Sequence, residues 1–348
     1  MDHTLPAEWA PQDAILLAWP HENTDWAPIL DEARRCFFRI IETISRFQRV
    51  VVLLNDHHQD FSRQSFSTPE NVSPVIVPFN DTWARDFGPL VLTEGSVNKL
   101  LDFKFNGWGL KFAADQDNLI NQRLLQHQVF DQKAVYENHL DFVLEGGSIE
   151  SDGEGTLLTT SQCLLTPNRN GVHSKEKIED ELKTRLGVHR ICWIDHGYLE
   201  GDDTDSHIDT LARFCNSETI AYVKCTDTSD PHYKALAAME KQLQSFQTGT
   251  GRPFHLLPLP MADPVIENHQ RLPATYANFL IINGAVLVPF YNSEKDMQAQ
   301  KTLQQVFPDR KVIGVDCTPL IRQNGSLHCV TMQLPEGVLN KGTLEQSP

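Results

Sequence analysis

The sequence lacks the marks of membrane, secreted and nucleic-acid-binding proteins. No apolar run approaches the roughly 18 residues that a membrane-spanning helix needs. The N-terminal stretch MDHTLPAEWAPQDA has neither a basic segment nor an apolar core, so it shows no secretory signal. Basic residues are scarce, because 30 Lys and Arg face 46 Asp and Glu for a net charge of −16, which opposes phosphate backbones and anionic lipid. We expect a cytoplasmic protein without nucleic-acid or membrane partners, and a homo-oligomer remains an open alternative.

Cysteines are few and show no pairing pattern. The seven are scattered and contain no CxxC pair, so neither a disulfide framework nor a zinc ribbon is indicated. Cys329 draws attention because it follows a Gly-Ser turn and a histidine in RQNGSLHCVTMQLP, at the start of a run that alternates like a strand. A free cysteine is more often a buried small hydrophobe than a nucleophile, so the residues around it must decide.

A helical pattern followed by a β-rich run occurs five times. Helical periodicity covers residues 28–47, 115–128, 174–187, 231–246 and 293–307, and β-rich runs start at residues 49, 133, 190, 254 and 311. After each run the chain turns and enters a further strand. Five equivalent modules around an axis would form one propeller-like α/β domain over residues 1–348. A mixed α/β sheet in which the equivalence is coincidental is the alternative.

In four of these five modules the segment that leads into the further strand carries residues capable of chemistry. Modules around an axis would bring these segments together at one end of it. The residues are Asp86, Glu145, His207 with Asp209, and Cys329.

Each candidate has a plainer interpretation when taken alone. Asp86, beside Arg85, is equally a turn residue in a surface ion pair, although a carboxylate near Trp83 also suits a planar cation. Glu145 precedes two glycines and could orient an imidazole, but such a residue is more often structural. In a strand entered at His207, residues 207 and 209 would share one face.

The segment GDDTDSHID is the densest cluster of acids and histidine in the chain. His207 and Asp209 could bind a metal with help from Asp203 or Asp205, or the segment could be a solvated loop. We favour a third interpretation, in which carboxylates hold a cationic substrate, the histidine moves a proton and Cys329 attacks an amidine carbon.

Five motifs together resemble the agmatine deiminase and bacterial peptidylarginine deiminase-like family. They are DTWARDFGP, FNGWG, LEGGSIESDGEGTLLTT, GDDTDSHID and NGSLHCVT, and LPAEWAPQDAILLAWPHENTDW resembles the family's opening. The resemblance covers almost the whole chain. It implies the pentein fold, a fivefold pseudosymmetric α/β propeller of ββαβ modules, which agrees with the repeats.

The resemblance also implies roles for individual residues. Cys329 corresponds to the nucleophile, His207 to the general acid and base, and Glu145 to the active-site acid. The guanidinium-binding carboxylates correspond to Asp86 and Asp209, and Trp83 to the indole beside the substrate's alkyl arm. We add Trp108 and Asp203 as candidate substrate-binding residues. The chain departs from the family by having Asn324 where glycine is usual, and Asn tolerates positive φ better than most residues.

The function that this resemblance implies is agmatine deiminase, a hydrolase that uses no cofactor and no metal. It would convert agmatine to N-carbamoylputrescine and ammonia through an amidino-cysteine intermediate. A peptidylarginine deiminase and a guanidino-binding protein without turnover are the alternatives. An acidic site favours a dication, whereas free arginine would need a cationic partner for its carboxylate. Arg85 and Arg322 are the candidates for such a partner, and we expect Arg85 to be engaged near Asp86.

Overall fold

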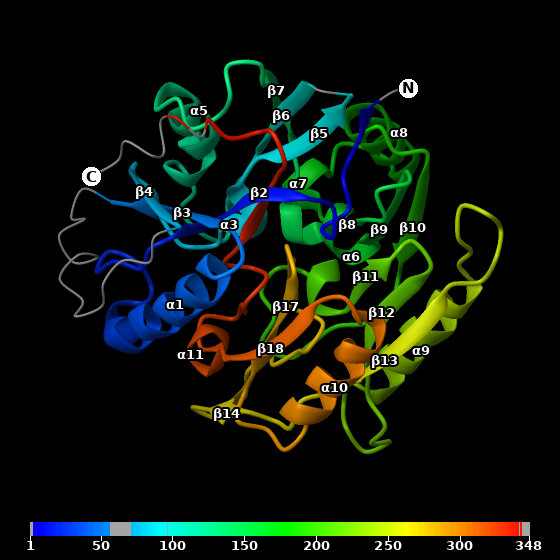
Figure 1. The fold of residues 1–348 in the computed structure, drawn as a ribbon. Helices are drawn as coiled ribbons and strands as arrows, with labels where there is room; N and C mark the ends of the chain where they lie inside the picture. Colours follow the sequence, from blue (N-terminus) through cyan, green and yellow to red (C-terminus); the bar gives the residue numbers. More distant parts are fainter. Residues whose placement is uncertain (1–2, 56–70, 96, 341, 343–348) are drawn as a thin grey trace.

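Among the described residues, five sheets of three or four strands are arranged around a common centre, and a sixth, two-stranded sheet is a separate hairpin. A computed structural model describes residues 3–55, 71–95, 97–340 and 342. Figure 1 shows the long helices at the periphery, from α1 (blue) to α10 (orange), with the strands nearer the centre. These helices are α1 (Leu30–Ser45), α5 (Ile120–Gln126), α8 (Lys175–Leu186), α9 (Tyr233–Ser245) and α10 (Asp296–Val306).

Each of the five sheets has three or four strands. The first sheet contains β19 (Met332–Pro335), β2 (Gln12–Ala18), β3 (Arg49–Leu54) and β4 (Val72–Ile76). The second contains β1 (His3–Thr4), β5 (Leu90–Glu94), β6 (Val97–Lys104) and β7 (Val135–Val143). The others are β8 (Ile149–Ser151), β9 (Thr156–Thr160) and β10 (Arg190–Ile194); β11 (Ala212–Asn216), β12 (Thr219–Lys224) and β13 (His255–Pro260); and β16 (Leu280–Ile282), β17 (Ala285–Phe290) and β18 (Lys311–Asp316).

All five sheets repeat one pairing pattern. In the third, β8 pairs antiparallel with β9, the chain crosses through α8, and β10 pairs parallel with β9. The same order holds for β5, β6 and β7, for β11, β12 and β13, and for β16, β17 and β18. The ββαβ modules that the family resemblance implies, and with which the repeats agree, are therefore confirmed. The alternative of one mixed sheet is wrong, because the strands form separate sheets.

The fifth module joins the two ends of the described chain. β19 pairs antiparallel with β2, whose crossover through α1 leads to the parallel partner β3. The strand that should begin this module therefore comes from the C-terminal part of the sequence. This pairing closes the ring of modules.

Local sequence explains why the helices and inner strands form where they do. The side chain of Ser174 caps α8 by accepting a hydrogen bond from the backbone N–H of Lys177, and Gly187 ends the helix at φ 66°. In β3 the run RVVVLL is buried from Val50 to Leu54, as expected for a parallel strand covered on both faces. Among the described residues, no helix is long and apolar enough to span a membrane.

Smaller elements lie within and between the modules. The short helices are α3 (Ala84–Phe87), α4 (Gly107–Leu110), α6 (Ser161–Leu164), α7 (Pro167–Asn170), α11 (Thr318–Ile321), η1 (Ala27–Ile29), η2 (Asp117–Leu119), η3 (Gly146–Ser148) and η4 (Ile208–Thr210). A separate hairpin consists of β14 (Ile266–Glu267) and β15 (Gln270–Arg271). We call the segment before the first strand of each module its leading loop, and these loops build the site described below.

Candidate active site

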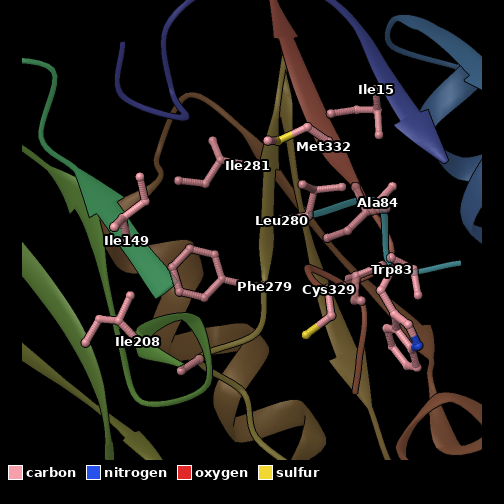
Figure 2. Packing of buried hydrophobic residues seen from close by; sticks show 14 of the residues in the cluster. Ile15, Trp83, Ala84, Ile149, Ile208, Phe279, Leu280, Ile281, Cys329 and Met332 are labelled. Atoms are coloured by element: carbon pink, nitrogen blue, oxygen red, sulfur yellow. The ribbon is translucent and has the colours of Figure 1, made fainter. Parts of the chain in front are cut away.

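A cavity of about 540 Å³, counted with its open mouth, lies where the leading loops meet. Figure 2 shows the sulfur of Cys329 and the indole of Trp83 at the same end of the packed core, away from Ile281 and Met332. The residues that line the cavity are Asp25, Asp81, Trp83, Asp86, Trp108, Phe112, Asp203, Thr204, Gln323, Asn324, Gly325 and Cys329. Four of them are carboxylates, and within the described part of the chain no lysine or arginine belongs to the lining.

The leading loops bring the sequence-predicted residues together, but through different local structure than the sequence suggested. His207 and Asp209 were expected in a strand, and instead His207 precedes the 3-10 turn η4, which contains Asp209. Cys329 was expected at a strand start, and β19 begins only at Met332. These two strand predictions are wrong at their boundaries because tight turns, not strands, place the side chains.

The surroundings of Gly147 show how closely the leading loops approach one another. A Cβ atom added to Gly147 would lie 2.7 Å from His207 Nδ1, 2.8 Å from Asp86 Oδ1 and 3.1 Å from Asp209 Oδ2. Three of the predicted groups thus surround one glycine of the Glu-Gly-Gly segment. Any side chain at this position would displace them, which explains why glycine is required here.

Cys329 is buried at the base of the cavity with 5% of its surface exposed. The amide of Asn278 donates a hydrogen bond to its sulfur at 3.3 Å, and the thiol lies 3.8 Å from Asp209 Oδ2. Burial together with the charges of Asp209 and Asp86 raises the pKa of the thiol well above its ordinary value. In the absence of a bound cation, Cys329 is therefore a neutral thiol.

Asp86 is held by neutral donors. Its oxygens accept hydrogen bonds from Trp108 Nε1 at 2.8 Å and from the backbone N–H of Gly147 at 2.9 Å, while His207 Nδ1 lies 3.6 Å away. Burial, with the neighbouring carboxylates of Asp209 and Glu145, raises its pKa to about 6. The carboxylate is therefore short of positive charge on the side facing the cavity.

Arg85 is not the partner of Asp86. Its guanidinium donates to Gln333 Oε1 and lies 3.5 Å from Glu8 Oε2, so it points away from the cavity. The expected surface ion pair is wrong, because both Arg85 and Asp86 are buried. Arg322 is engaged as well, with Glu267 and Glu32 at 2.8 Å each.

Asp209 has one bonded oxygen and one free oxygen. Oδ2 accepts a hydrogen bond from His328 Nδ1 at 2.8 Å. Oδ1 is buried without a hydrogen-bond partner among the described residues. Burial opposes ionisation, but the hydrogen bond and charge of His328 lower the pKa of Asp209 below its ordinary value. A buried, ionised oxygen without a donor is costly, and a cationic ligand would satisfy it.

His207 and Glu145 form a buried acid–base pair behind the cavity. His207 Nε2 lies 3.2 Å from Glu145 Oε2, and Arg169 Nε lies 2.8 Å from the same oxygen. Burial alone would lower the pKa of His207, but Asp86, Cys163 and Glu145 raise it well above its ordinary value. Burial likewise opposes ionisation of Glu145, whose pKa His207 and Arg169 nevertheless lower. The imidazole is thus held ready to donate a proton.

The mouth of the cavity contains Asp203, Trp83 and the turn before the nucleophile. Asn324 adopts φ 65°, so it occupies the left-handed region as expected, and its amide donates to Asp203 Oδ2 at 3.1 Å. A Cβ atom on Gly325 would lie 2.1 Å from the Trp83 ring. The Asn-Gly turn is therefore packed directly against the indole.

The structure does not support the alternative of a metal site at His207 and Asp209. Among the described residues, one group of three metal-ligand types lies within binding range, and it contains Glu145, Cys163 and His207. Asp209 is not part of that group, and Arg169 already bonds both oxygens of Glu145.

Sequence reasoning missed Arg169, Asp25 and Asp81 of the site, and it also missed Asn278, which contacts the nucleophile. Asn278 lies in the leading loop of β16, the one module for which no chemical residue was proposed. Its amide donates to Cys329 Sγ, and its Oδ1 accepts the backbone N–H of His328 at 2.8 Å. The fivefold repeat was the available signal, since the equivalent position in the other four modules carries a functional candidate.

The chain is similar to known proteins over almost its whole length. The model of the Porphyromonas-type peptidyl-arginine deiminase family matches residues 4–335. The chain belongs to this family. Family membership makes it a hydrolase of the deiminase type, acting on a C–N bond of an amidine. The five-module architecture is the pentein-type α/β propeller of its structural neighbours.

Three relatives of the family illustrate the similarity. A Porphyromonas gingivalis structure provisionally named arginine deiminase is 51% identical, with a TM-score of 0.93, and the alignment covers 97% of this chain and 100% of that one. A Cys→Ser variant of C. jejuni agmatine deiminase with substrate bound is 40% identical, with a TM-score of 0.89, over 96% and 97% of the two chains. A Vibrio parahaemolyticus protein provisionally named agmatine deiminase is 34% identical over 95% and 96%.

Proposed function

We propose that the protein is an agmatine deiminase that needs no cofactor. Relatives with this name align over nearly the full length, at 30–40% identity among the solved structures named without qualification. The observation that carries the proposal is the cavity itself. It places Cys329 at the base of a site whose lining includes four carboxylates, with no lysine or arginine among the described lining residues.

The two carboxylates beside Cys329 suit a guanidinium. Asp86 is held by neutral donors and Asp209 Oδ1 has no donor, so both gain from a planar cation that donates several N–H groups. Binding of the cation also offsets the two charges that keep the thiol neutral. The substrate thereby promotes loss of the Cys329 proton to solvent, and the thiolate attacks the guanidinium carbon.

His207 then moves the protons of both half-reactions. As an imidazolium it donates a proton to the departing nitrogen, which leaves as ammonia while the carbon stays bonded to Cys329. The neutral imidazole next accepts a proton from water, and the resulting hydroxide adds to the amidino carbon. Breaking the carbon–sulfur bond releases N-carbamoylputrescine, and the proton that its hydroxyl loses on forming the carbonyl restores the Cys329 thiol. Glu145 and Arg169 hold the imidazole in place through this cycle.

The mouth of the cavity distinguishes agmatine from free arginine. We assign Trp83 and Trp108 to the alkyl arm, and Asp203 to the distal amine, with Asp81 close by. Burial and the neighbouring Asp25 raise the pKa of Asp81 to about 6, so its carboxylate is short of positive charge. Lys111 is the nearby cation, and its Nζ donates to the backbone carbonyl of Asp203 at 2.6 Å and to Asp205 at 2.9 Å. An α-carboxylate placed here would meet like charges, at a cost of several kcal/mol.

Peptidyl-arginine is the second candidate substrate. The family description names it, and two solved structures with 51% and 46% identity are provisionally named arginine and peptidyl-arginine deiminases. Because its carboxylate is bonded as an amide, the acidic mouth does not exclude it. A guanidino-binding protein without turnover is disfavoured, since the nucleophile, the acid–base pair and both carboxylates are assembled.

Rates with agmatine, free arginine and a blocked arginine peptide test the proposal. We expect agmatine to have the highest kcat/KM, with free arginine at least ~100-fold lower because its carboxylate lacks a cationic partner. An equal or higher kcat/KM for the peptide would mean that peptidyl-arginine, and not agmatine, is the substrate, and the proposed mechanism would still apply. No ammonia release from any of the three would refute the proposed activity.

Two expectations from the sequence remain proposals. We infer that residues 1–348 act as one domain, because β19 completes the sheet of β2 and β3. We also propose a cytoplasmic location, which suits seven cysteines that are all free and buried.

A further inference from the structure

A second histidine, His328, lies directly beneath the cavity and has no part in the mechanism above. It precedes Cys329 in the chain and is 1% exposed. Its Nδ1 lies 2.8 Å from Asp209 Oδ2, and its Nε2 lies 2.6 Å from Glu8 Oε2. The imidazole therefore bridges a carboxylate of the site and a carboxylate of the N-terminal segment.

Both ring nitrogens of His328 face carboxyl oxygens, and the protonation state of the ring follows if Asp209 and Glu8 are both ionised. A carboxylate can only accept hydrogen bonds, so each ring nitrogen must carry a proton to bond its partner. A neutral imidazole would turn one lone pair toward a carboxylate oxygen at hydrogen-bonding distance. With both nitrogens donating, His328 is an imidazolium, and its charge lies between Asp209 and Glu8.

Glu8 is itself held from several elements of the fold. Its Oε2 accepts a hydrogen bond from Arg213 at 2.9 Å and lies 3.5 Å from Arg85, while Oε1 accepts the backbone N–H of Ile281 at 2.6 Å. Figure 1 shows the blue segment that joins β1 to β2 turning beside β8, at the centre of the ring. Glu8 thus anchors the N-terminal segment under the site.

With all three neighbouring acids ionised, the charges around this histidine balance only when it is protonated. Glu150, on β8, bonds Arg213 Nε at 2.7 Å, so the buried cluster contains three acids and two arginines besides His328. The acids are Glu8, Glu150 and Asp209, and the arginines are Arg85 and Arg213. A third positive charge makes the cluster neutral, which low-dielectric surroundings favour.

We propose that Glu8 and His328 are positioning residues, which form a carboxylate–imidazolium–carboxylate chain that keeps Asp209 ionised and leaves its Oδ1 open to the substrate's guanidinium. Neither residue touches the substrate. The chain deepens the proposed function, and its kinetic consequences rest on that function. The charge of His328, however, is a property of the protein without substrate.

The contacts of His328 determine in which direction its loss changes the pKa of Asp209. If the positive charge of His328 is removed, burial acts unopposed on Asp209 and its pKa rises. Asp209 then takes up a proton at a higher pH, and the protonated form binds a guanidinium poorly. The low-pH limb of kcat/KM should therefore move upward, by about one to three pH units. Removing the charge of Glu8 acts in the same direction through His328.

Nitrogen-15 NMR of the substrate-free protein is the first test, and it needs no turnover. We expect both ring nitrogens of His328 to carry protons between about pH 6 and pH 8, with the resonances assigned by their loss in His328→Gln. A neutral ring at neutral pH would overturn the proposal. This result stands even if agmatine is not the substrate.

Kinetics of His328→Gln and Glu8→Gln form the second test. We expect KM for agmatine at neutral pH to rise at least ~10-fold, with a smaller change in kcat, and activity to recover as the pH is raised. The matched control is His232→Gln, which removes another buried histidine that contacts a carboxylate, Asp230, at 2.6 Å. The control should leave the pH profile unchanged. A uniform loss of kcat without pH recovery in the two variants would show a merely structural role.

Discussion

The cavity wall and the layer behind it handle buried charge in opposite ways. On the wall, Asp86 accepts hydrogen bonds only from neutral donors, with His207 Nδ1 3.6 Å away. Asp209, which lies beside Cys329 although it is not among the lining residues, has one oxygen without a hydrogen-bond partner among the described residues. Behind it, Glu145 bonds both His207 and Arg169, and Glu8 bonds both His328 and Arg213. The carboxylates beside Cys329 are therefore less fully compensated than those in the layer behind them. This arrangement stores binding energy in the free protein and releases it when the substrate enters.

The largest expected difference between the two layers concerns two buried thiols. Cys329→Ala should abolish turnover, because only this thiol faces the cavity and can form the covalent intermediate. Cys163→Ala should retain the chemistry, although Cys163 lies 3.7 Å from Glu145 Oε2. Mass spectrometry of a quenched reaction should find the adduct on the peptide that contains Cys329. An adduct on Cys163 would show that Cys163, and not Cys329, is the nucleophile.

The second-largest expected effect is on kcat/KM, and it should distinguish Asp86 and Asp209 from the nearby Asp202. Asp86→Asn and Asp209→Asn should each reduce kcat/KM by at least ~10³-fold while the protein stays folded, because each loses a charge-assisted bond to the guanidinium. The matched control is Asp202→Asn, which should be mild because Asp202 bonds only its own loop, at Thr204 and Ser206. Loss of activity on treatment with a chelator, with both wall variants still active, would instead support a metal site.

The smallest expected effect is on stability, and its sign differs between the layers. Burial raises the pKa of Asp86 to about 6, so its ionisation destabilises the folded state as the pH rises from about 4 to about 6. The pKa of Glu145 is lowered despite burial, so its contribution to stability is present above its unfolded pKa and lost as the pH falls below it.

Unfolding in urea at neutral pH should reveal this difference. Asp86→Asn should leave the free energy of unfolding unchanged or raise it by ~1 kcal/mol, whereas Glu145→Gln should lower it by ~3 kcal/mol. Equal destabilisation by both substitutions would show that the wall is not under electrostatic strain. Repeating the Asp86→Asn measurement near pH 4 should remove any gain, because the wild-type carboxyl is then protonated.

The sequence was informative where the signal was local and periodic. The five helices and the β-rich runs after them are found close to the predicted residues, and the module repeat brought Asp86, Glu145, His207 and Cys329 to one place. The strand predictions around His207 and Cys329 failed because turn geometry depends on packing against other modules. An Asn-Gly turn seated on Trp83 is an example.

Contacts between distant segments could not be predicted. Glu8 and His328 are 320 positions apart, and no periodicity or motif links them. Asn278 carried no signal of its own, since its role depends on the position of a sulfur atom in another module. Such contacts arise only after the ring is closed.

The closure of the ring by β19 also has a consequence for the timing of synthesis. β2 emerges first, but its partner β19 is made some 300 residues later, after roughly 15 to 60 s at ordinary rates of translation. Modules whose strands are consecutive can pair as they leave the ribosome, whereas the module that carries the nucleophile must wait. A nascent chain therefore gains its reactive centre in one late step, and a chain that terminates before Cys329 cannot acquire it.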